Sequence, residues 1–167
     1  ITAGGVVTTL ASSSSTPTLG APGLGGSAGL AVDGSGNVYA ANVANGVIQK
    51  ISASGEVATL AGVMYNGGGV DGAGNIAKFN RPSGVALDGK GNFFIADPGN
   101  HSIRKITAAG LGTTQAGALA SSQSKDGISG LARFDGPRGV AVDGGGNVFV
   151  ADRLNYTIRK VSPSGVV

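Results

Sequence analysis

Residues 139–152 read GVAVDGGGNVFVAD, and this stretch decides the fold because close copies of it occur twice more. The copies are GLAVDGSGNVYAAN at residues 29–42 and GVALDGKGNFFIAD at residues 84–97. In each copy, two short apolar runs flank a turn whose Gly and Asn residues accept positive φ, which is typical of a β-hairpin. Asp33, Asp88 and Asp143 are each 55 residues apart. A fixed period of this length predicts a repeat architecture.

Each repeat contains two further predicted strands. The third strand of the middle repeat is SIRKIT at residues 102–107, and a fourth follows a glycine turn, most clearly as EVATLA at residues 56–61. Four antiparallel strands repeated at a fixed period are typical of the blades of a β-propeller. We therefore predict an all-β fold in a single domain at residues 1–167, with three four-stranded blades. The blade repeats are 29–62, 84–117 and 139–167, and the inter-blade connectors are 12–28, 63–83 and 118–138.

The third repeat resembles the NHL repeat in three segments, which are PRGVAVD at 137–143, GNVFVAD at 146–152 and NYTIRK at 155–160. The resemblance extends over nearly the whole chain, although the first repeat has Ser27 where the others have Pro82 and Pro137. It implies a β-propeller, commonly of six blades, that acts as an interaction surface. A minority of related propellers are lyases or hydrolases, so the resemblance defines the fold more closely than the function.

Composition argues against several classes of protein. The chain has no cysteine, which excludes disulfides, thiol catalysis and cysteine-bound zinc. It has one histidine and one glutamate, His101 and Glu56, so we expect no catalytic residues, no metal site and no cofactor. The net charge of +3 lacks a basic block, so no nucleic-acid partner is expected. No apolar run approaches the roughly 18 residues that span a bilayer, so no membrane span is expected. Low charge and the start at Ile1 suggest a secreted, extracellular bacterial protein.

The long connectors indicate which face of the propeller binds a partner. In an up-and-down blade, the connector and the loop between the second and third strands open on the same side. Loops of this kind carry function more often than the strands that support them. The candidate ligand-binding residues are Tyr65, Asn66, His101, Arg153 and Tyr156. The expected ligand is another protein or a glycan.

The two ends of the chain predict self-assembly. Residues 1–11 match residues 51–61, the end of a repeat, whereas the chain stops where the fourth strand of the last blade should begin. Three blades do not close a ring, because propellers have about four to eight. We predict that the orphan strand at 1–11 completes the last blade of a second copy, giving a six-bladed homodimer. The assembly residues are Ile1, Val6, Val7, Leu10, Ile158 and Val161. A head-to-tail filament, or a piece of a longer propeller such as a lyase or hydrolase, is the alternative.

Other repeated residues are interpreted as structural. Phe79 and Phe134 are expected to fill the gaps between neighbouring blades. Asp97 and Asp152 are expected to pair with Arg104 and Arg159 on the adjacent strand, as a clasp within each blade. The Asp-Gly-x-Gly-Asn turns have some likeness to a calcium loop, but they recur wherever a hairpin turn is needed and lack the downstream glutamate.

Overall fold

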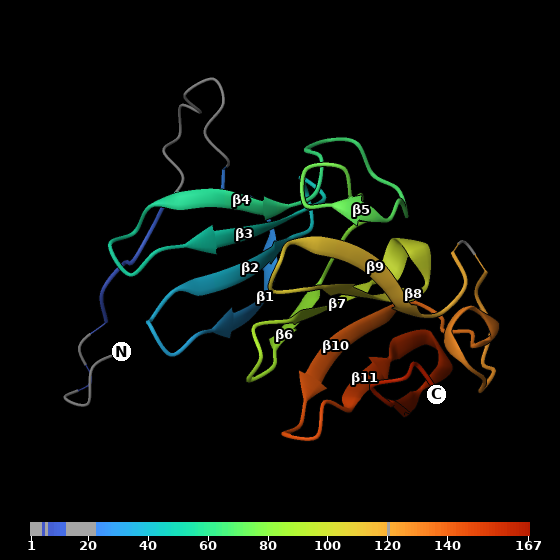
Figure 1. Cartoon of the computed structure of the whole chain (residues 1–167). Helices are drawn as coiled ribbons and strands as arrows, with labels where there is room; N and C mark the ends of the chain where they lie inside the picture. Colours follow the sequence, from blue (N-terminus) through green and yellow to red (C-terminus); the bar gives the residue numbers. More distant parts are fainter. Residues whose placement is uncertain (1–4, 6, 13–22, 120) are drawn as a thin grey trace.

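The computed structural model describes residues 5, 7–12, 23–119 and 121–167, which form three antiparallel sheets (Figure 1). The first sheet is β1 (Ser27–Val32), β2 (Val38–Asn42), β3 (Val47–Ile51) and β4 (Val57–Ala61). The second is β5 (Gly72–Ala73), β6 (Gly84–Leu87), β7 (Phe93–Asp97), β8 (Ser102–Ile106) and β9 (Leu111–Ala116), in the order β5-β9-β8-β7-β6. The third is β10 (Pro137–Val142), β11 (Val148–Asp152) and β12 (Thr157–Val161). Three 3-10 turns occupy Pro98–Asn100, Ser129–Leu131 and Arg153–Asn155.

This architecture confirms the all-β prediction and shows a partial propeller of three blade-like sheets. The prediction of four strands in each blade is wrong for the second sheet, because the connector adds the short strand β5 to its outer edge. Ala73 pairs there with Leu111. The bridge between Ile128 and Val166 repeats this pairing 55 residues later. The third sheet has three full strands.

The hairpin turns are held by their aspartates. Asp33 Oδ1 accepts hydrogen bonds from the backbone amides of Ser35 and Asn37, and Oδ2 accepts one from Asn37 Nδ2. Asp88 and Asp143 repeat this arrangement. The hydrogen bond from the Asn37 side chain is the largest influence that lowers the pKa of Asp33 to about 2. The carboxylate oxygens are thus engaged by the turn itself, which gives these residues a structural role.

Two apolar clusters join the three sheets. The cluster between the first and second sheets includes Tyr39, Ile48 and Phe93, and the cluster between the second and third includes Phe94, Ile103 and Val150. Phe79 lies in the first cluster and Phe134 in the second, and both side chains are fully buried. The prediction that these two phenylalanines fill the gaps between blades is confirmed.

The predicted clasps are also present. Arg104 Nη1 lies 3.3 Å from Asp97 Oδ2, and Arg159 Nη1 lies 3.1 Å from Asp152 Oδ2. The guanidinium of Arg104 also stacks over Phe79, 5.2 Å from the ring centroid. Burial raises the pKa of Asp97 to about 6, against the hydrogen bonds and the Arg104 charge, which act to lower it. An uncompensated charge here would be costly, so each clasp depends on both partners.

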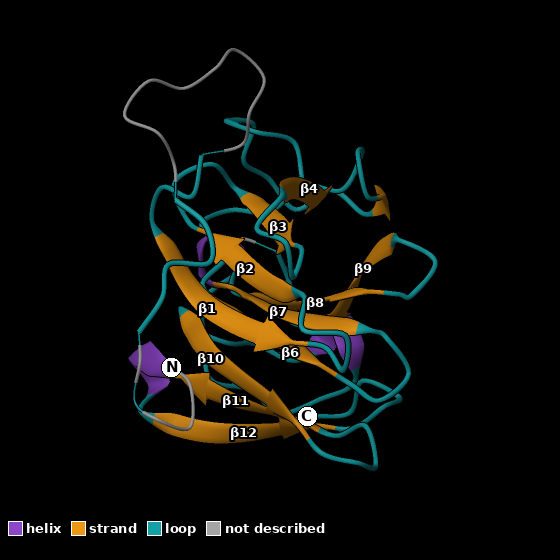
Figure 2. Ribbon diagram, turned by 90° about the vertical axis from the view of Figure 1, so that its left-hand side faces the viewer, coloured by secondary structure: helices purple, strands orange, loops and turns teal. Residues whose placement is uncertain are grey.

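The first strands of the sheets, β1, β6 and β10, lie side by side (Figure 2). Their close approach depends on glycine. A Cβ on Gly29 would come within 2.5 Å of Ser83 O, and one on Gly84 would clash with Arg138 O. The equivalent Gly139 has ample space, since its nearest such neighbour is Ala151 Cβ at 3.6 Å. Within the described residues, Gly139 therefore lacks the close backbone neighbour that Gly29 and Gly84 have.

Candidate functional site

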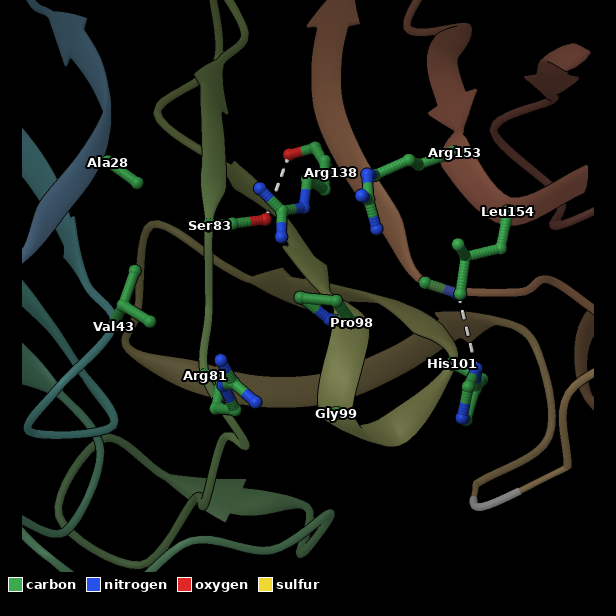
Figure 3. Close-up of a pocket in the computed structure, with 11 residues that line it drawn as sticks. Ala28, Val43, Arg81, Ser83, Pro98, Gly99, His101, Arg138, Arg153 and Leu154 are labelled. Carbon is green, nitrogen blue, oxygen red and sulfur yellow. Dashed lines mark hydrogen bonds between the residues drawn. The ribbon is translucent and has the colours of Figure 1, made fainter. Parts of the chain in front are cut away.

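The described structure contains a pocket bordered by all three sheets, which we call the interblade pocket (Figure 3). Its volume is about 240 Å³. The lining is part apolar and part basic, and it comprises Ala28, Val43, Arg81, Ser83, Pro98, Gly99, His101, Gly136, Arg138, Arg153 and Leu154. A concave site with a few convergent polar groups is the usual form of a small-ligand site.

The repeat explains why these residues meet. Ala28, Ser83 and Arg138 occupy the same place at or next to the start of the first strand, each 55 residues from the next. Val43, Pro98 and Arg153 likewise follow the second strand of each sheet. Adjacent first strands are held together here, because Ser83 Oγ donates to Arg138 O over 3.0 Å. Equivalent backbone positions thus carry different side chains around one pocket.

His101 is held at the edge of the pocket by its backbone and its ring. It caps the turn Pro98–Asn100 in a left-handed conformation, with φ at 52°. Its Nδ1 lies 3.2 Å from the backbone amide of Gly136 and 3.3 Å from Asp135 Oδ1. A neutral ring with its lone pair on Nδ1 accepts from the amide, whereas a protonated ring pairs with the carboxylate. The ring is therefore oriented in either state.

The structure brings some of the predicted ligand-binding residues together and leaves others apart. His101 and Arg153 line the interblade pocket. Tyr65 lines a neighbouring pocket of about 330 Å³ instead, and Asn66 accepts a hydrogen bond from Lys78 Nζ. Tyr156 is 92% exposed and lines neither pocket.

Arg81 and Arg138 also line the interblade pocket and were not among the residues selected from the sequence. The alignment of the repeats contains a signal for them. Arg81 stands where the other repeats have Gly26 and Gly136, and Arg138 stands where they have Ala28 and Ser83. At these two positions, a large basic side chain thus replaces the small residues of the other repeats, which marks both positions as particular to their own repeat.

The predicted assembly residues fall into different environments. Ile1 and Val6 lie outside the described residues, as do most of the residues of the connector at 12–28. Val7 is exposed, and residues 7–11 are not in a strand in this structure. Leu10 lies against the outer face of the first sheet, in a groove that Leu30 and Ile51 also line.

The third sheet contributes the other predicted assembly residues. Ile158 is 75% exposed, whereas its equivalents Ile48 and Ile103 are fully buried. Val161 is itself fully buried in the cluster with the second sheet, so its side chain is not available to a partner. The physical reason is strand alternation, which points Val161 to the opposite face from Ile158.

The described residues contain no group of three or more side chains suited to hold a metal ion, and no helix that is long and apolar enough to cross a membrane. The candidate functional site is the interblade pocket, with its basic and apolar lining residues.

Comparison with known proteins supports the repeat assignment. A family model described as the NHL repeat matches residues 79–106 and 134–161. The Arabidopsis thaliana protein SUPPRESSOR OF QUENCHING 1, chloroplastic, is 29% identical over 98 residues, which are 59% of this chain and 9% of that protein.

Solved structures extend the similarity to three dimensions. A Bacteroides thetaiotaomicron protein of unknown function is 29% identical with a TM-score of 0.71, over 75% of this chain and 32% of that one. An auxiliary nutrient binding protein from the same species is 26% identical with a TM-score of 0.71, over 78% of this chain and 36% of that one. Virginiamycin B lyase from Staphylococcus aureus shares the fold, at 17% identity and a TM-score of 0.57, over 82% of this chain and 38% of the lyase. The chain thus spans about a third of the length of these structures.

Proposed function

We propose that this chain, which matches the NHL repeat at residues 79–106 and 134–161, is a non-catalytic extracellular module that binds a protein or a glycan on its connector face and assembles with a second copy of itself. Binding is supported by the interblade pocket, which the connectors and the loops between second and third strands border. The Bacteroides nutrient binding protein, which is similar over 78% of this chain, is consistent with a binding role. Low charge and high glycine content favour an extracellular location.

The arrangement of polar groups in the pocket favours binding over catalysis. His101 is the chain's single histidine, and its Nδ1 is engaged by Gly136 and Asp135. Ser83, the hydroxyl residue that lines the same pocket, donates a hydrogen bond to the backbone carbonyl of Arg138. A nucleophile must instead be hydrogen-bonded to its base. The pocket therefore holds an oriented imidazole without an activated hydroxyl beside it.

Self-assembly is supported by one observation above all, which is that the two outermost sheet faces are apolar and open. Leu30 on the first sheet is 63% exposed, whereas its equivalent Val85 on the second sheet is 5% exposed. On the third sheet, Phe149 is 38% exposed and its equivalent Phe94 is 3% exposed. The exposed residues on each open face are therefore equivalent to residues that form buried contacts in the second sheet. A contact between the open faces of two copies would reproduce the contacts already present between neighbouring sheets.

The position of Leu10 fits the same junction. Leu60, its equivalent in the repeat, lies in β4 and packs against the cluster between the first and second sheets. Leu10 lies beside Leu30 and Ile51 on the open face of the first sheet. In a dimer, the same segment would contact the first sheet of its own chain and pair with β12 of the second copy.

Light scattering of the 167-residue chain tests the assembly. We expect twice the mass of one chain, and we expect Ile158→Lys to give single chains, because a charged side chain would enter the apolar junction. Leu111→Lys is the matched control, since Leu111 is half-exposed on the middle sheet and should leave the mass unchanged. A parent chain that is monomeric at micromolar concentration would contradict the proposal, and particles of unlimited size would favour a filament over a closed dimer.

A further inference from the structure

Three arginines converge on the interblade pocket without partners. Arg81, Arg138 and Arg153 all line it, and Figure 3 shows their side chains reaching in from different segments of the chain. Within the described residues, none of their guanidinium groups forms a hydrogen bond or ion pair. Five donors on each guanidinium are therefore available.

The other arginines behave differently. Arg104 and Arg159 bind carboxylates and backbone carbonyls, and Arg133 donates to the carbonyls of Gly130 and Ala132. Arginines in this chain are thus paired wherever they serve the fold. Among the described residues, the acidic side chain paired with a lining residue of the pocket is Asp135, which contacts His101. Asp135 does not pair with Arg81, Arg138 or Arg153, so the positive charges of these three arginines are uncompensated.

The backbone at Arg81 adds an independent observation. Arg81 has a φ of 60°, and its equivalents Gly26 and Gly136 have φ of 71° and 56°. Glycine adopts such a conformation without steric cost, whereas a residue with a side chain does not. Of these three positions, the one that carries a long basic side chain is Arg81. It borders both the interblade pocket and the neighbouring pocket that Tyr65 lines. Such strained positions are frequent at ligand sites.

We infer that the interblade pocket is an anion site that takes the carboxylate or phosphate group of a small anionic ligand. This inference rests on the proposed binding function of the connector face but not on self-assembly, because one chain supplies the whole pocket. Guanidinium groups match the planar geometry of a carboxylate and the oxygens of a phosphate, and they bind both through paired hydrogen bonds. Arg138, Arg153 and Arg81 hold the anionic group, and Val43, Pro98 and Leu154 contact the body of the ligand.

Calorimetric titration with four probes tests the site and identifies the anion. The probes are glucuronate for a carboxylate on a sugar, glucose 6-phosphate for a phosphate on the same body, inorganic phosphate without a body, and glucose as the neutral control. We expect glucuronate or glucose 6-phosphate to bind and glucose not to bind, and we expect affinity to fall as salt screens the charges. Glucuronate alone would assign a carboxylate site, and glucose 6-phosphate alone would assign a phosphate site.

Variants separate the pocket from general surface charge. Arg138→Gln and Arg153→Gln should each weaken binding by about tenfold or more, because each removes charge-assisted hydrogen bonds. Lys90→Gln, which removes one positive charge from a turn outside the pocket, should leave affinity unchanged. Arg81→Gly should also weaken binding, while its thermal midpoint stays equal or rises as the positive φ is relieved. That result would show that the loss of binding is not a loss of folding.

Other outcomes would overturn the inference. Equal binding of glucose and glucuronate would leave a binding face without an anion site, and so would refute this inference but not the proposed function. Anion binding that Arg138→Gln, Arg153→Gln and Lys90→Gln reduce equally would show a diffuse surface effect. Failure of all four probes to bind would refute the anion site for small ligands.

Discussion

At the scale of the residue, the clasps show how one set of positions accepts two chemistries. In the second sheet the clasp is the buried ion pair of Asp97 with Arg104. The equivalent positions in the first sheet are Asn42 and Gln49, and Asn42 Nδ2 donates to Gln49 Oε1 over 3.0 Å. A neutral amide pair therefore fills the same buried space.

The amide pair provides a matched test of the charged clasp. Arg104→Gln should lower the free energy of unfolding by about 3–5 kcal/mol, because it leaves Asp97 buried without its cation. Adding Asp97→Asn should recover at least half of that loss, since the pair then has the residue types found in the first sheet. Urea unfolding of the two single variants and the double variant measures this. A double variant less stable than Arg104→Gln would contradict the account.

The aspartates also predict how stability depends on pH. Hydrogen bonds from the turn lower the pKa of Asp33 to about 2, and the pKa values of Asp88 and Asp143 are lowered too, although burial opposes the shift at Asp88. Their contribution is present above about pH 4 and is lost as pH falls towards 2. Asp97 has the opposite sign: burial raises its pKa to about 6, so its protonated form favours folding, and this contribution is lost as pH rises from about 4 to 6. Unfolding curves from pH 2 to 8 should show both trends, and Asp97→Asn should remove the second.

At the scale of the element, the strands were predictable and the connectors were not. Alternating apolar residues and Gly-Asn turns gave the positions of β1–β4 and their copies, because the period of two is strong in those segments. The strand β5 is two residues long and begins with Gly72, so it has no such pattern. It forms because the connector is tied to the sheet by Asp71, which binds Arg104 Nη2 at 2.7 Å and accepts from the amide of Thr114.

This tie predicts a local effect of Asp71. Asp71→Ala should cost about 1 kcal/mol, because the carboxylate is half-exposed and Arg104 keeps Asp97. It should nevertheless release the connector, which limited proteolysis within residues 63–83 would detect. Asp126→Ala is the matched control, since Asp126 binds Arg159 but its side chain is 81% exposed, so we expect a smaller change in stability. Equal resistance of the parent and Asp71→Ala to protease would contradict this role.

At the scale of the whole molecule, the repeat predicted a stack of blades, and the structure shows what the repeat could not. His101 and Arg153 were selected because they lie in loops between second and third strands, which open on the same side as the connectors, and both line the interblade pocket. Arg81 and Arg138 were missed because their approach depends on how three sheets are placed around β6, which no single repeat encodes. The open faces were also not predictable from one repeat. Val85 is buried and its equivalent Leu30 is exposed because a neighbouring sheet covers Val85, not because their own repeats differ.

The same unequal burial predicts a gradient of local stability across the molecule. The second sheet is covered on both faces, and Ile95, Ala96 and Ile103 are fully buried. Strand β12 has the same pattern as β8, yet it lies at the edge of its sheet with Ile158 exposed. Amide hydrogens exchange through local opening, which requires less free energy where fewer apolar contacts are broken. At low protein concentration, residues 157–161 should therefore exchange faster than residues 102–106.

The dependence of hydrogen exchange on protein concentration tests whether copies of the chain assemble. If a second copy covers the outer faces, hydrogen exchange at residues 157–161 and 27–32 should slow as concentration rises, because association stabilises the bound state by mass action. Exchange at residues 93–97 should stay unchanged, since both faces of β7 are already covered within one chain. Ile158→Lys should remove the dependence on concentration. A gradient that persists at every concentration would mean that copies of this chain do not cover these faces and that the second sheet alone is the stable centre of the molecule.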